Sequence, residues 1–385
     1  MHQIINENLI IHISHTDIRF DSRILKELNS LQMIKDKTIN ALGIEDRINK
    51  NKKYNSNIIK IETIHLKSKS LLFLPRAFLY FLNFIEANII FTFKILILKP
   101  KIIHCHDTFL LPSAALINLI LGSTLFYDAH ELESNKNGQS YILSKITLFI
   151  EKVCWSRISL LISVSKSIIC WYENHLGRKR SEVILNSPEI SNYKNNLNNN
   201  KNYLREKYKI PEKAKIFIYV GLLSEGRNIK TFLEIFSERE IKDHLVIIGE
   251  GKLSKLIKRF SKKNKNIHLH KSVPHYDLVS LLKESDVGLC LIENVSLSDY
   301  YCLPNKLFEY MFAGLYILAS DFPEINLLSR EFDSIRLCKS DKEIIKSEIK
   351  NLISQKIKKY NNEYQSLSWK YQTEKLYSAY KNFID

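Results

Sequence analysis

The chain has 385 residues, of which 45% are hydrophobic and only 10 are glycine, and its formal net charge is +16. These values exclude a disordered or fibrous polymer, and the length suits two domains of roughly 150 to 200 residues each. The 6 cysteines form no CxxC pair, so neither a zinc site nor a disulfide framework is indicated, and a reducing cytosol fits best. Residues 1–8 are polar, so we expect no signal peptide.

The positive charge has three interpretations: a nucleic acid, an acidic membrane surface or an anionic small substrate. Nucleic acid is the weakest, because the chain has no zinc-finger, RNP or helix-turn-helix pattern and its Lys and Arg residues are spread along the sequence. We therefore expect no nucleic-acid partner. The membrane surface and the anionic substrate both stay open.

The first half of the chain alternates between strand and helix patterns. Leu9 to Ser14 is a short apolar run, and Asp21 is placed to cap a helix that begins at Ser22. Further buried strands are predicted at Ile102 to Cys105, Thr124 to Tyr127, Leu160 to Val164 and Val183 to Leu185. Strands that alternate with helices predict a parallel sheet covered on both faces.

Leu71 to Leu98 is the most apolar region and exceeds the roughly 20 residues that span a bilayer. Arg76, Glu86 and Lys94 interrupt it, and charges are costly at a bilayer centre. One interpretation is a long helix packed on the sheet. The other is an amphipathic helix lying in the plane of a membrane, helped by Arg76, Lys94, Lys99 and Lys101.

The segment 192–202 is rich in Asn and Lys, which is typical of an exposed linker. The alternation restarts after it, with strands predicted at Ile216 to Val220, Leu245 to Ile248, Ile267 to Leu269, Val287 to Leu291 and Tyr316 to Ala319. Helices are predicted at Asn228 to Phe236, Leu253 to Phe260, Tyr276 to Glu284 and Asn305 to Phe312. The fold class is therefore α/β, with two doubly wound, Rossmann-like domains, residues 1–191 and 203–368, facing each other across a cleft.

The segment from Leu303 to Gly314 has the pattern of a ligand-binding helix start. Pro304 at the first helical position, free backbone N–H groups and Lys306 suit a phosphate. Glu309 lies about one turn further in, where a carboxylate can accept hydrogen bonds from two hydroxyls of a ribose. The alternative is an ordinary amphipathic helix with a solvated Glu.

Polar residues also follow the predicted strands of the first half, where ligands bind in open α/β sheets. His104 and His106 share a strand face, which would suit a metal pair, but we see no third ligand nearby and expect no metal. His106 and Asp107 end their strand, which favours a functional His106 and a structural His104. The other strand-end residues are His130, Glu131, Ser165 and Asn186.

For His130 and Glu131 we expect acceptor binding or ordering of His106, with capping of the following segment as the alternative. Ser165 is placed similarly, and Asn186 ends the last strand and shapes the interdomain turn. His268 and His270 look like strand surface residues without a role.

Taken together, these motifs resemble the GT-B glycosyltransferases, specifically glycosyltransferase family 4, over nearly the whole chain. The matching segments besides Leu303 to Gly314 are Ile103 to Asp107, Tyr127 to Glu131, Ser163 to Ser167, Tyr219 to Arg227 and Ile248 to Gly251. The resemblance implies retention of configuration, a nucleotide-sugar donor on the second domain and no cofactor. It also implies that the last helix, residues 369–385, crosses back to the first domain.

Site residues follow from the resemblance position by position. It implies that Glu309 holds the ribose, that Arg227 neutralises the pyrophosphate and that His106 lies near the reacting sugar. We accordingly predict His106, Arg227 and Lys306 as catalytic. The predicted donor-binding residues are Gly221, Arg227, Gly249, Glu250, Val273, Asn305, Lys306 and Glu309, and the predicted acceptor residues are Asp107, His130, Glu131, Ser165 and Asn186.

The chain departs from the family pattern at two positions. Leu222 stands where the family often has an Arg, so Lys306 is expected to compensate for a missing phosphate cation. Tyr301 stands where the family's E-x7-E pattern needs an acid, which affects donor-sugar recognition.

The predicted function is that of a retaining, metal-independent glycosyltransferase that moves a sugar from a nucleoside-diphosphate donor to a hydroxyl acceptor. The expected acceptor is a lipid-linked or surface-polysaccharide precursor of the capsule or O-antigen type, and the expected location is the cytoplasm, at the inner face of a bacterial cytoplasmic membrane. Two alternatives stay open: a nucleotide-sugar 2-epimerase of the same fold, and a non-catalytic nucleotide-sugar-binding subunit.

Overall fold

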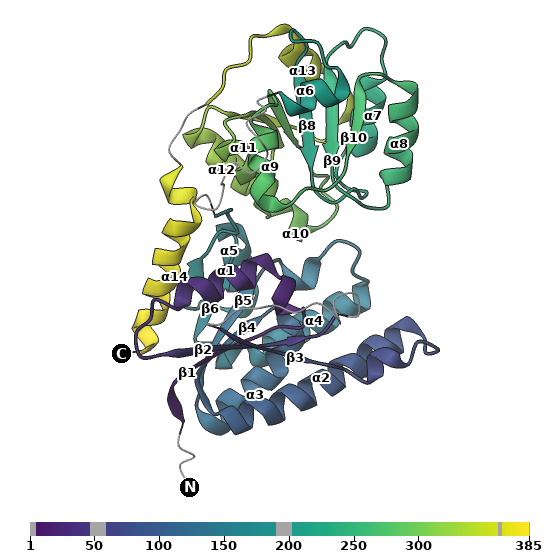
Figure 1. Ribbon diagram of the computed structural model, residues 1–385. Coiled ribbons are helices and arrows are strands. Elements are labelled where there is room, and N and C mark those ends of the chain that lie inside the picture. Colours follow the sequence, from purple (N-terminus) through teal and green to yellow (C-terminus); the bar gives the residue numbers. More distant parts are fainter. Residues whose placement is uncertain (1–4, 47–58, 190–201, 361–363, 385) are drawn as a thin grey trace. The chain divides into compact units, whose positions relative to one another are not determined.

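The computed structural model describes residues 5–46, 59–189, 202–360 and 364–384 (Figure 1). Its contacts divide the chain into two compact units, the first made of Met1–Leu185 with Gln372–Asp385 and the second of Asn186–Tyr371. The expected linker 192–202 lies outside the described residues except for Asn202.

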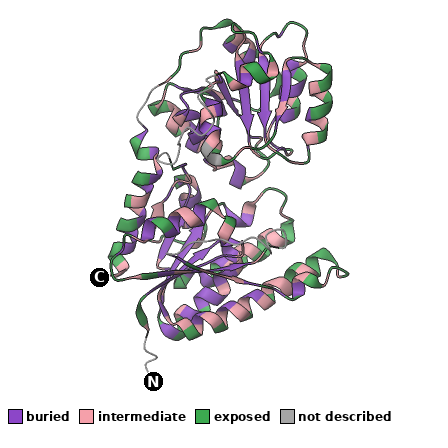
Figure 2. Cartoon of the chain, in the orientation of Figure 1, coloured by how far each residue is buried: buried purple, intermediate pink, exposed green. Residues whose placement is uncertain are grey.

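The first unit is built on a parallel sheet of seven strands in the order β3-β2-β1-β4-β5-β6-β7. Burial of the central strands explains their near-continuous apolar runs, since helices cover both faces (Figure 2). The strands are β1 Asn6–Ile13, β2 Thr38–Ile44, β3 Lys60–Ile64, β4 Pro100–His106, β5 Thr124–Ala129, β6 Leu160–Ser163 and β7 Ser181–Val183.

The helices of this unit are α1 Ser22–Leu31, α2 Arg76–Leu98, α3 Leu111–Leu121, α4 Tyr141–Cys154, α5 Lys166–Leu176 and α14 Trp369–Ile384. The predicted cap of α1 is confirmed, because the Asp21 carboxylate accepts from the backbone N–H groups of Arg23 and Ile24. Successive side chains of a strand point to opposite faces of the sheet, so they contact different helical layers. On β5, Phe126 points to α14, where it contacts Tyr380, whereas Tyr127 points to the other face and donates to Glu151 of α4.

Helix α14 belongs to the first unit from Gln372 onward. Gln372 accepts from the backbone N–H of Leu185, and Thr373 shares a 2.8 Å hydrogen bond with Ser30 of α1. Tyr380, also a residue of α14, is fully buried. The C-terminal segment therefore contributes side chains to the core of the first sheet.

The second unit has a parallel sheet of six strands in the order β10-β9-β8-β11-β12-β13. The strands are β8 Ile216–Val220, β9 His244–Ile248, β10 Ile267–His270, β11 Val287–Cys290, β12 Tyr316–Ser320 and β13 Ile335–Cys338. The helices are α6 Tyr203–Tyr208, α7 Ile229–Phe236, α8 Ser254–Lys263, α9 His275–Leu282, α10 Leu297–Tyr300, α11 Asn305–Phe312, α12 Pro323–Glu331 and α13 Lys342–Ser354.

The prediction of two doubly wound parallel-sheet units is confirmed. The surface placement of His268 and His270 is wrong, because α6 covers this end of the sheet and both side chains are buried. The Tyr208 ring stacks on His268 with centroids 4.4 Å apart, and His268 Nε2 lies 2.8 Å from His244 Nδ1. These histidines are packing residues of the second unit.

Candidate functional site

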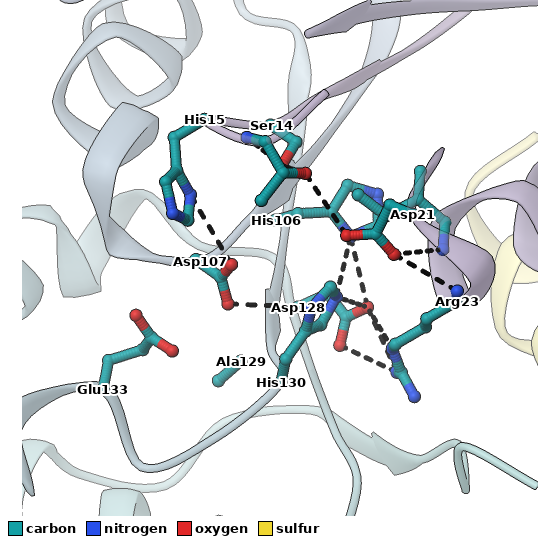
Figure 3. Close-up of polar contacts among 12 residues, drawn as sticks. Ser14, His15, Asp21, Arg23, His106, Asp107, Asp128, Ala129, His130 and Glu133 are labelled. Carbon is teal, nitrogen blue, oxygen red and sulfur yellow. Dashed lines mark hydrogen bonds and ion pairs between the residues drawn. The ribbon is translucent and has the colours of Figure 1, made fainter. Parts of the chain in front are cut away.

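The central strands of the first unit bring four polar side chains together at their carboxyl ends. Strand pairing sets His12 of β1 beside His104 of β4, and His106 of β4 beside Asp128 of β5. His130 follows directly after β5. Because the strands are parallel and in this register, residues far apart in the sequence reach one small volume (Figure 3).

The histidines form a continuous chain of hydrogen bonds. The His130 Nε2 atom lies 3.0 Å from His106 Nδ1, and His106 Nε2 lies 3.0 Å from His12 Nδ1. The Tyr380 hydroxyl then lies 3.2 Å from His12 Nε2 and 2.5 Å from His104 Nδ1. Both ends of the chain return to Asp128, whose Oδ2 lies 3.1 Å from His130 Nε2 and 3.6 Å from His104 Nε2. We call this arrangement the histidine ring.

One consistent set of tautomers gives each contact of the ring a donor and an acceptor. A proton on His104 Nε2 faces the Asp128 carboxylate, so His104 Nδ1 accepts from the Tyr380 hydroxyl. The Tyr380 oxygen then accepts from His12 Nε2–H, His12 Nδ1 accepts from His106 Nε2–H, and His106 Nδ1 accepts from His130 Nε2–H. From His130 to Asp128 the donors thus follow one direction, and the His130 Nε2–H is shared between His106 Nδ1 and Asp128 Oδ2.

Asp128 is held as a carboxylate by an arginine from α1. The Arg23 guanidinium donates to both Asp128 oxygens at 3.0 and 3.1 Å and to the Ile184 carbonyl at 3.0 Å (Figure 3). Burial works to raise the pKa of Asp128, but Arg23 and His130 hold it well below its usual range. Glu27, also buried, lies 3.1 Å from Arg23 Nε, and burial with the nearby Asp128 charge raises its pKa to about 8.

The ring separates a charged histidine from neutral ones. Burial and the neighbouring His104 lower the pKa of His106 to about 3. Burial also works to lower the pKa of His130, but Asp107 and Asp128 overcome this and raise it to about 9. His130 is therefore an imidazolium at neutral pH. Its side chain is 18% exposed, while those of His104 and His106 are completely buried.

His130 is consequently the histidine of the ring that solvent and substrate can reach. His106, expected to lie near the reacting sugar, has both ring nitrogens engaged inside the ring. His104 is part of the same ring rather than a packing residue alone. Sequence reasoning missed His12, Arg23, Glu27 and Tyr380, because no local motif marks them.

Asp107 completes the polar surface around His130. It has φ 60°, which is unusual for a residue with a side chain, and its N–H donates to the Asp128 carbonyl at 3.0 Å. Its carboxylate oxygens lie 3.8 Å from His130 Nδ1 and 3.6 Å from His15 Nδ1. Burial works to raise the pKa of Asp107, whereas His130 and Lys136 lower it below its usual range. A strained backbone position at a polar cluster is typical of functional sites.

The other predicted acceptor residues differ in exposure and in local role. Glu131 is exposed, next to His130. The buried Ser165 side chain caps α5 by accepting from the Ile168 N–H at 3.3 Å, so capping accounts for it. Asn186 is half-buried at the first position of the second unit.

In the second unit, two strand-end loops approach so closely that glycine is required. Gly221 has φ 130° and Gly249 has φ 145°. A Cβ atom on Gly249 would lie 2.0 Å from the Gly221 carbonyl oxygen, so no side chain fits there. The predicted Gly221 and Gly249 are thus neighbours. Glu250 is exposed beside them, and Val273 is half-buried between β10 and α9.

Three charged residues predicted for the donor site, Arg227, Lys306 and Glu309, act electrostatically on Cys290 of β11. Burial raises the pKa of the Cys290 thiol to about 11, while Lys306 and Arg227 work to lower it and Glu309 to raise it. Lys306 Nζ lies 3.9 Å from the Tyr219 ring centroid and would lie 3.6 Å from a Cβ on Gly221. Lys306 and Glu309 both belong to α11, and Glu309 is 6% exposed.

The helix predicted at Asn305 to Phe312 is α11, but Pro304 stands one residue before its first position rather than at it. Pro304 has ψ 139° and is the N-cap, so Asn305, an exposed residue, is the first helical position. The reason is that the Pro304 backbone is still extended, although its φ is already fixed by the ring. Lys306 keeps its place in the first turn.

Arg227 has an anchor that sequence reasoning missed. Its Nη1 atom donates to Asp299 Oδ1 at 3.0 Å, and Asp299 is itself held by the Ser296 hydroxyl at 2.9 Å. Asp299 belongs to α10, two residues before Tyr301, where the family pattern places an acid. An acidic residue two positions before Tyr301 therefore contacts the predicted phosphate ligand.

Two groups in the ring have donor atoms close enough together for a metal ion. The first group is His12, Glu27, His104 and His106, and the second is His106, Asp128 and His130. Within each group the donor atoms lie within 4.8 Å of one another. The expectation that no third ligand lies near His104 and His106 is therefore wrong. The strands β1 and β5 and helix α1 supply the additional ligands, which the local spacing of β4 does not reveal.

Residues 200–366 match the family model described as Glycosyl transferases group 1. No curated protein matches the chain. The fold is similar to sucrose-phosphate synthase from Thermosynechococcus elongatus, with TM-score 0.71 and 13% identity over 98% of this chain and 96% of that one. Anabaena HepE in complex with UDP gives TM-score 0.63 and 13% identity over 97% of this chain and 95% of that one.

The apo form of the lipopolysaccharide outer core galactosyltransferase WaaB gives TM-score 0.62 and 16% identity over 98% of this chain and 99% of that one. At identities this low, the solved structures show the fold alone, and the family model covers residues 200–366. The chain therefore has the GT-B glycosyltransferase fold, and residues 200–366 of its second unit match the glycosyl transferase group 1 model.

Proposed function

We propose that the protein is a retaining, metal-independent glycosyltransferase that moves a sugar from a nucleoside-diphosphate donor to a hydroxyl acceptor. The observation that carries this is the family-model match of residues 200–366, the segment that holds Arg227, Lys306 and Glu309, whose charges all act on the buried Cys290. Retention is proposed because the chain resembles family 4.

The charges of the second unit suit a departing nucleoside diphosphate. Arg227 and Lys306 supply two cations for the negative charge that develops when the glycosidic bond breaks. Asp299 fixes the Arg227 guanidinium in advance, which reduces the reorganisation needed in the transition state. Glu309, in the second turn of α11, would accept hydrogen bonds from the ribose hydroxyls. The HepE structures with UDP and with UDP-glucose make UDP the first nucleotide to test.

The acceptor site is proposed at the histidine ring of the first unit. Because His130 is an imidazolium at neutral pH, its role would be to donate a hydrogen bond to a sugar or phosphate oxygen rather than to remove a proton. Asp107, an acceptor beside it, would bind a sugar hydroxyl. His106 would hold the His130 ring in place through its Nδ1 lone pair.

We propose a lipid-linked or surface-polysaccharide precursor as the acceptor, used at the inner face of the cytoplasmic membrane. The apolar outer surface of the first unit supports this proposal, because several helices there expose large hydrophobic side chains. A basic chain with a net charge of +16 is also suited to an anionic membrane surface.

The donor site is tested by thermal-shift binding of UDP, GDP, CDP, ADP and dTDP to the wild type, to Glu309→Ala and to Glu331→Ala. Glu331 is an exposed residue at the end of α12 and serves as the matched control. One diphosphate should raise the melting temperature of the wild type and the control but not of Glu309→Ala. If none shifts any of the three proteins, the donor site is wrong.

Activity is tested separately by incubating the matching nucleotide sugar with the protein and measuring free nucleoside diphosphate. Slow hydrolysis without acceptor supports the enzyme. Binding without any turnover, even with membrane extract as acceptor, would instead support the non-catalytic binding subunit. Release of an epimerised sugar would support the 2-epimerase.

A further inference from the structure

Helix α2 has one buried face and one exposed apolar face. The inward side chains Ala87, Phe91 and Ile95 are fully buried. The outward side chains follow each other every three or four residues along the helix and are Phe78, Phe81, Ile85, Ile89, Phe93 and Ile97. Phe93 is 64% exposed and Ile97 is 79% exposed. A helix with both faces apolar needs a partner on its outer side.

Helices α3 and α4 continue this surface. Helix α3 packs beside α2, with the Ser113 N–H donating to the Asn88 side chain at 3.1 Å, and α4 packs beside α3 (Figure 1). Their exposed side chains are Leu116, Leu119 and Ile120 on α3, and Tyr141, Ile142, Ile146, Phe149 and Val153 on α4. We call these residues, with the outward residues of α2, the apolar face; much of it is exposed (Figure 2).

The exposed charges of α2, α3 and α4 have one sign. The only acidic residues in α2, α3 and α4, all of whose residues are described, are Glu86 and Glu151. The Glu86 carboxylate accepts from the backbone N–H groups of Lys67 and Ser68, and Glu151 is fully buried beneath three hydroxyl groups. The basic residues Arg76, Lys145 and Lys152 are exposed. The surface thus combines apolar side chains with positive charge.

Helix α2 is the one helix in the described part of the chain that is long and apolar enough to cross a bilayer by length and composition. Its polar contacts argue for an in-plane position instead. Asn88 donates to the Phe109 carbonyl at 3.0 Å and accepts from Ser113, and Glu86 is bound by two backbone amides. These contacts hold the middle of α2 against the rest of the first unit.

We infer that the apolar face docks on an anionic lipid bilayer, with α2 lying in the interfacial plane. Apolar side chains would enter the acyl boundary, while Arg76, Lys145 and Lys152 would contact the headgroups of acidic lipids. A second copy of the chain is a poorer occupant, because a twofold contact would bring these cations together without acidic partners. The inference deepens and rests on the proposed function, since it names the surface through which a lipid-linked acceptor is reached.

The test is co-sedimentation with phosphatidylcholine vesicles prepared with and without phosphatidylglycerol. The variants are Phe93→Asp with Phe149→Asp, Lys145→Glu with Lys152→Glu, and the control Met33→Asp, whose side chain is 59% exposed on the same unit outside the apolar face. All replaced side chains are exposed, and circular dichroism verifies folding.

The wild type and Met33→Asp should bind the acidic vesicles and lose binding at high salt. The phenylalanine variant should bind at least about tenfold more weakly for each ring removed. The lysine variant should bind acidic vesicles about fivefold more weakly for each lysine replaced. Its affinity for neutral vesicles should change little.

Equal binding of the wild type and the phenylalanine variant, or no wild-type binding, would overturn the inference. Light scattering could instead show a wild-type dimer that Phe93→Asp with Phe149→Asp dissociates. Such a dimer, in a protein that binds no vesicles, would overturn the inference in favour of self-association. The nucleotide thermal shift, measured on the same variants, separates the two proposals, because it depends on the second unit and should not change.

Discussion

The hydroxyl of Tyr380, in the last helix of the chain, lies 2.5 Å from Nδ1 of His104, in the middle of the first sheet. The same hydroxyl lies 3.2 Å from His12 Nε2. This residue links His12 to His104 within the hydrogen-bond chain that orients His106 and His130. The tautomers at the proposed acceptor site therefore depend on a side chain from the C-terminal helix.

Replacement of Tyr380 by Phe should destabilise the first unit, because His12 Nε2–H and His104 Nδ1 lose their shared partner while remaining buried. We expect a loss of about 1–3 kcal/mol in the free energy of unfolding, measured by urea denaturation. Tyr377→Phe, on an exposed residue of the same helix, is the control and should stay within about 0.5 kcal/mol of the wild type. Equal stabilities of both variants would contradict the ring.

His130 should make stability depend on pH. Its folded pKa of about 9 lies above the ordinary value of 6.5, so its stabilising contribution is complete below pH 6.5 and is lost as the pH rises through 9. The difference in denaturation midpoint between the wild type and His130→Asn should therefore shrink from pH 6.5 to pH 9. Glu27 titrates in the same range, and its pKa is itself lowered by the His130 charge, so both proteins should carry Glu27→Gln. A constant difference would mean that His130 is not charged in the folded protein.

Gly249→Ala should affect the second unit far more than an ordinary glycine substitution. The added Cβ would meet the Gly221 carbonyl oxygen at 2.0 Å, so the loop after β8 must move. We expect the free energy of unfolding to fall by more than about 3 kcal/mol, or nucleotide binding to be lost. Gly138→Ala, with φ +77° and no atom within 4 Å of its Cβ, isolates the backbone strain and should cost only about 1 kcal/mol. Similar losses in both would contradict the close approach.

Asp299→Asn should weaken the donor site through Arg227. Without the carboxylate at 3.0 Å, the guanidinium is no longer fixed. We therefore expect KM for the donor to rise about tenfold, with a smaller change in kcat. Arg227→Ala should lower kcat more strongly than Asp299→Asn, because it removes the cation itself. If Asp299→Asn matches the wild type in both parameters, the positioning role is wrong.

Chelation should leave transfer activity unchanged, although the ring contains two groups with metal-like spacing. The imidazolium state of His130 competes with metal binding, because a ligand nitrogen must be deprotonated. Activity before and after dialysis against EDTA, with the metal content measured in parallel, checks this. Loss of activity that zinc or another divalent ion restores would show that the ring holds a metal.

Some features follow from local sequence because their causes are local. Asp21 caps α1 through the next few amides, and the residues of β8 and α11 fall within one residue of the predicted ranges. Strand ends predicted His106, Asp107 and His130 as one group, since parallel strands finish at one edge of a sheet.

Other strands escaped sequence reasoning. We did not predict β2, β3 or β13, whose short runs mix apolar and polar residues. Strands of this kind are fixed by pairing with neighbours rather than by their own pattern.

The sequence by itself determined the α/β class, the two doubly wound units and the residue types at both candidate sites, because periodicity, caps and glycine positions act over a few residues. Only the tertiary structure decided which of these residues act together. His12, Arg23 and Tyr380 join His106 through contacts across the sheet, and Asp299 reaches Arg227 from another loop. Burial then sets the charge of each histidine, and burial depends on the packed molecule, not on the neighbours in the chain.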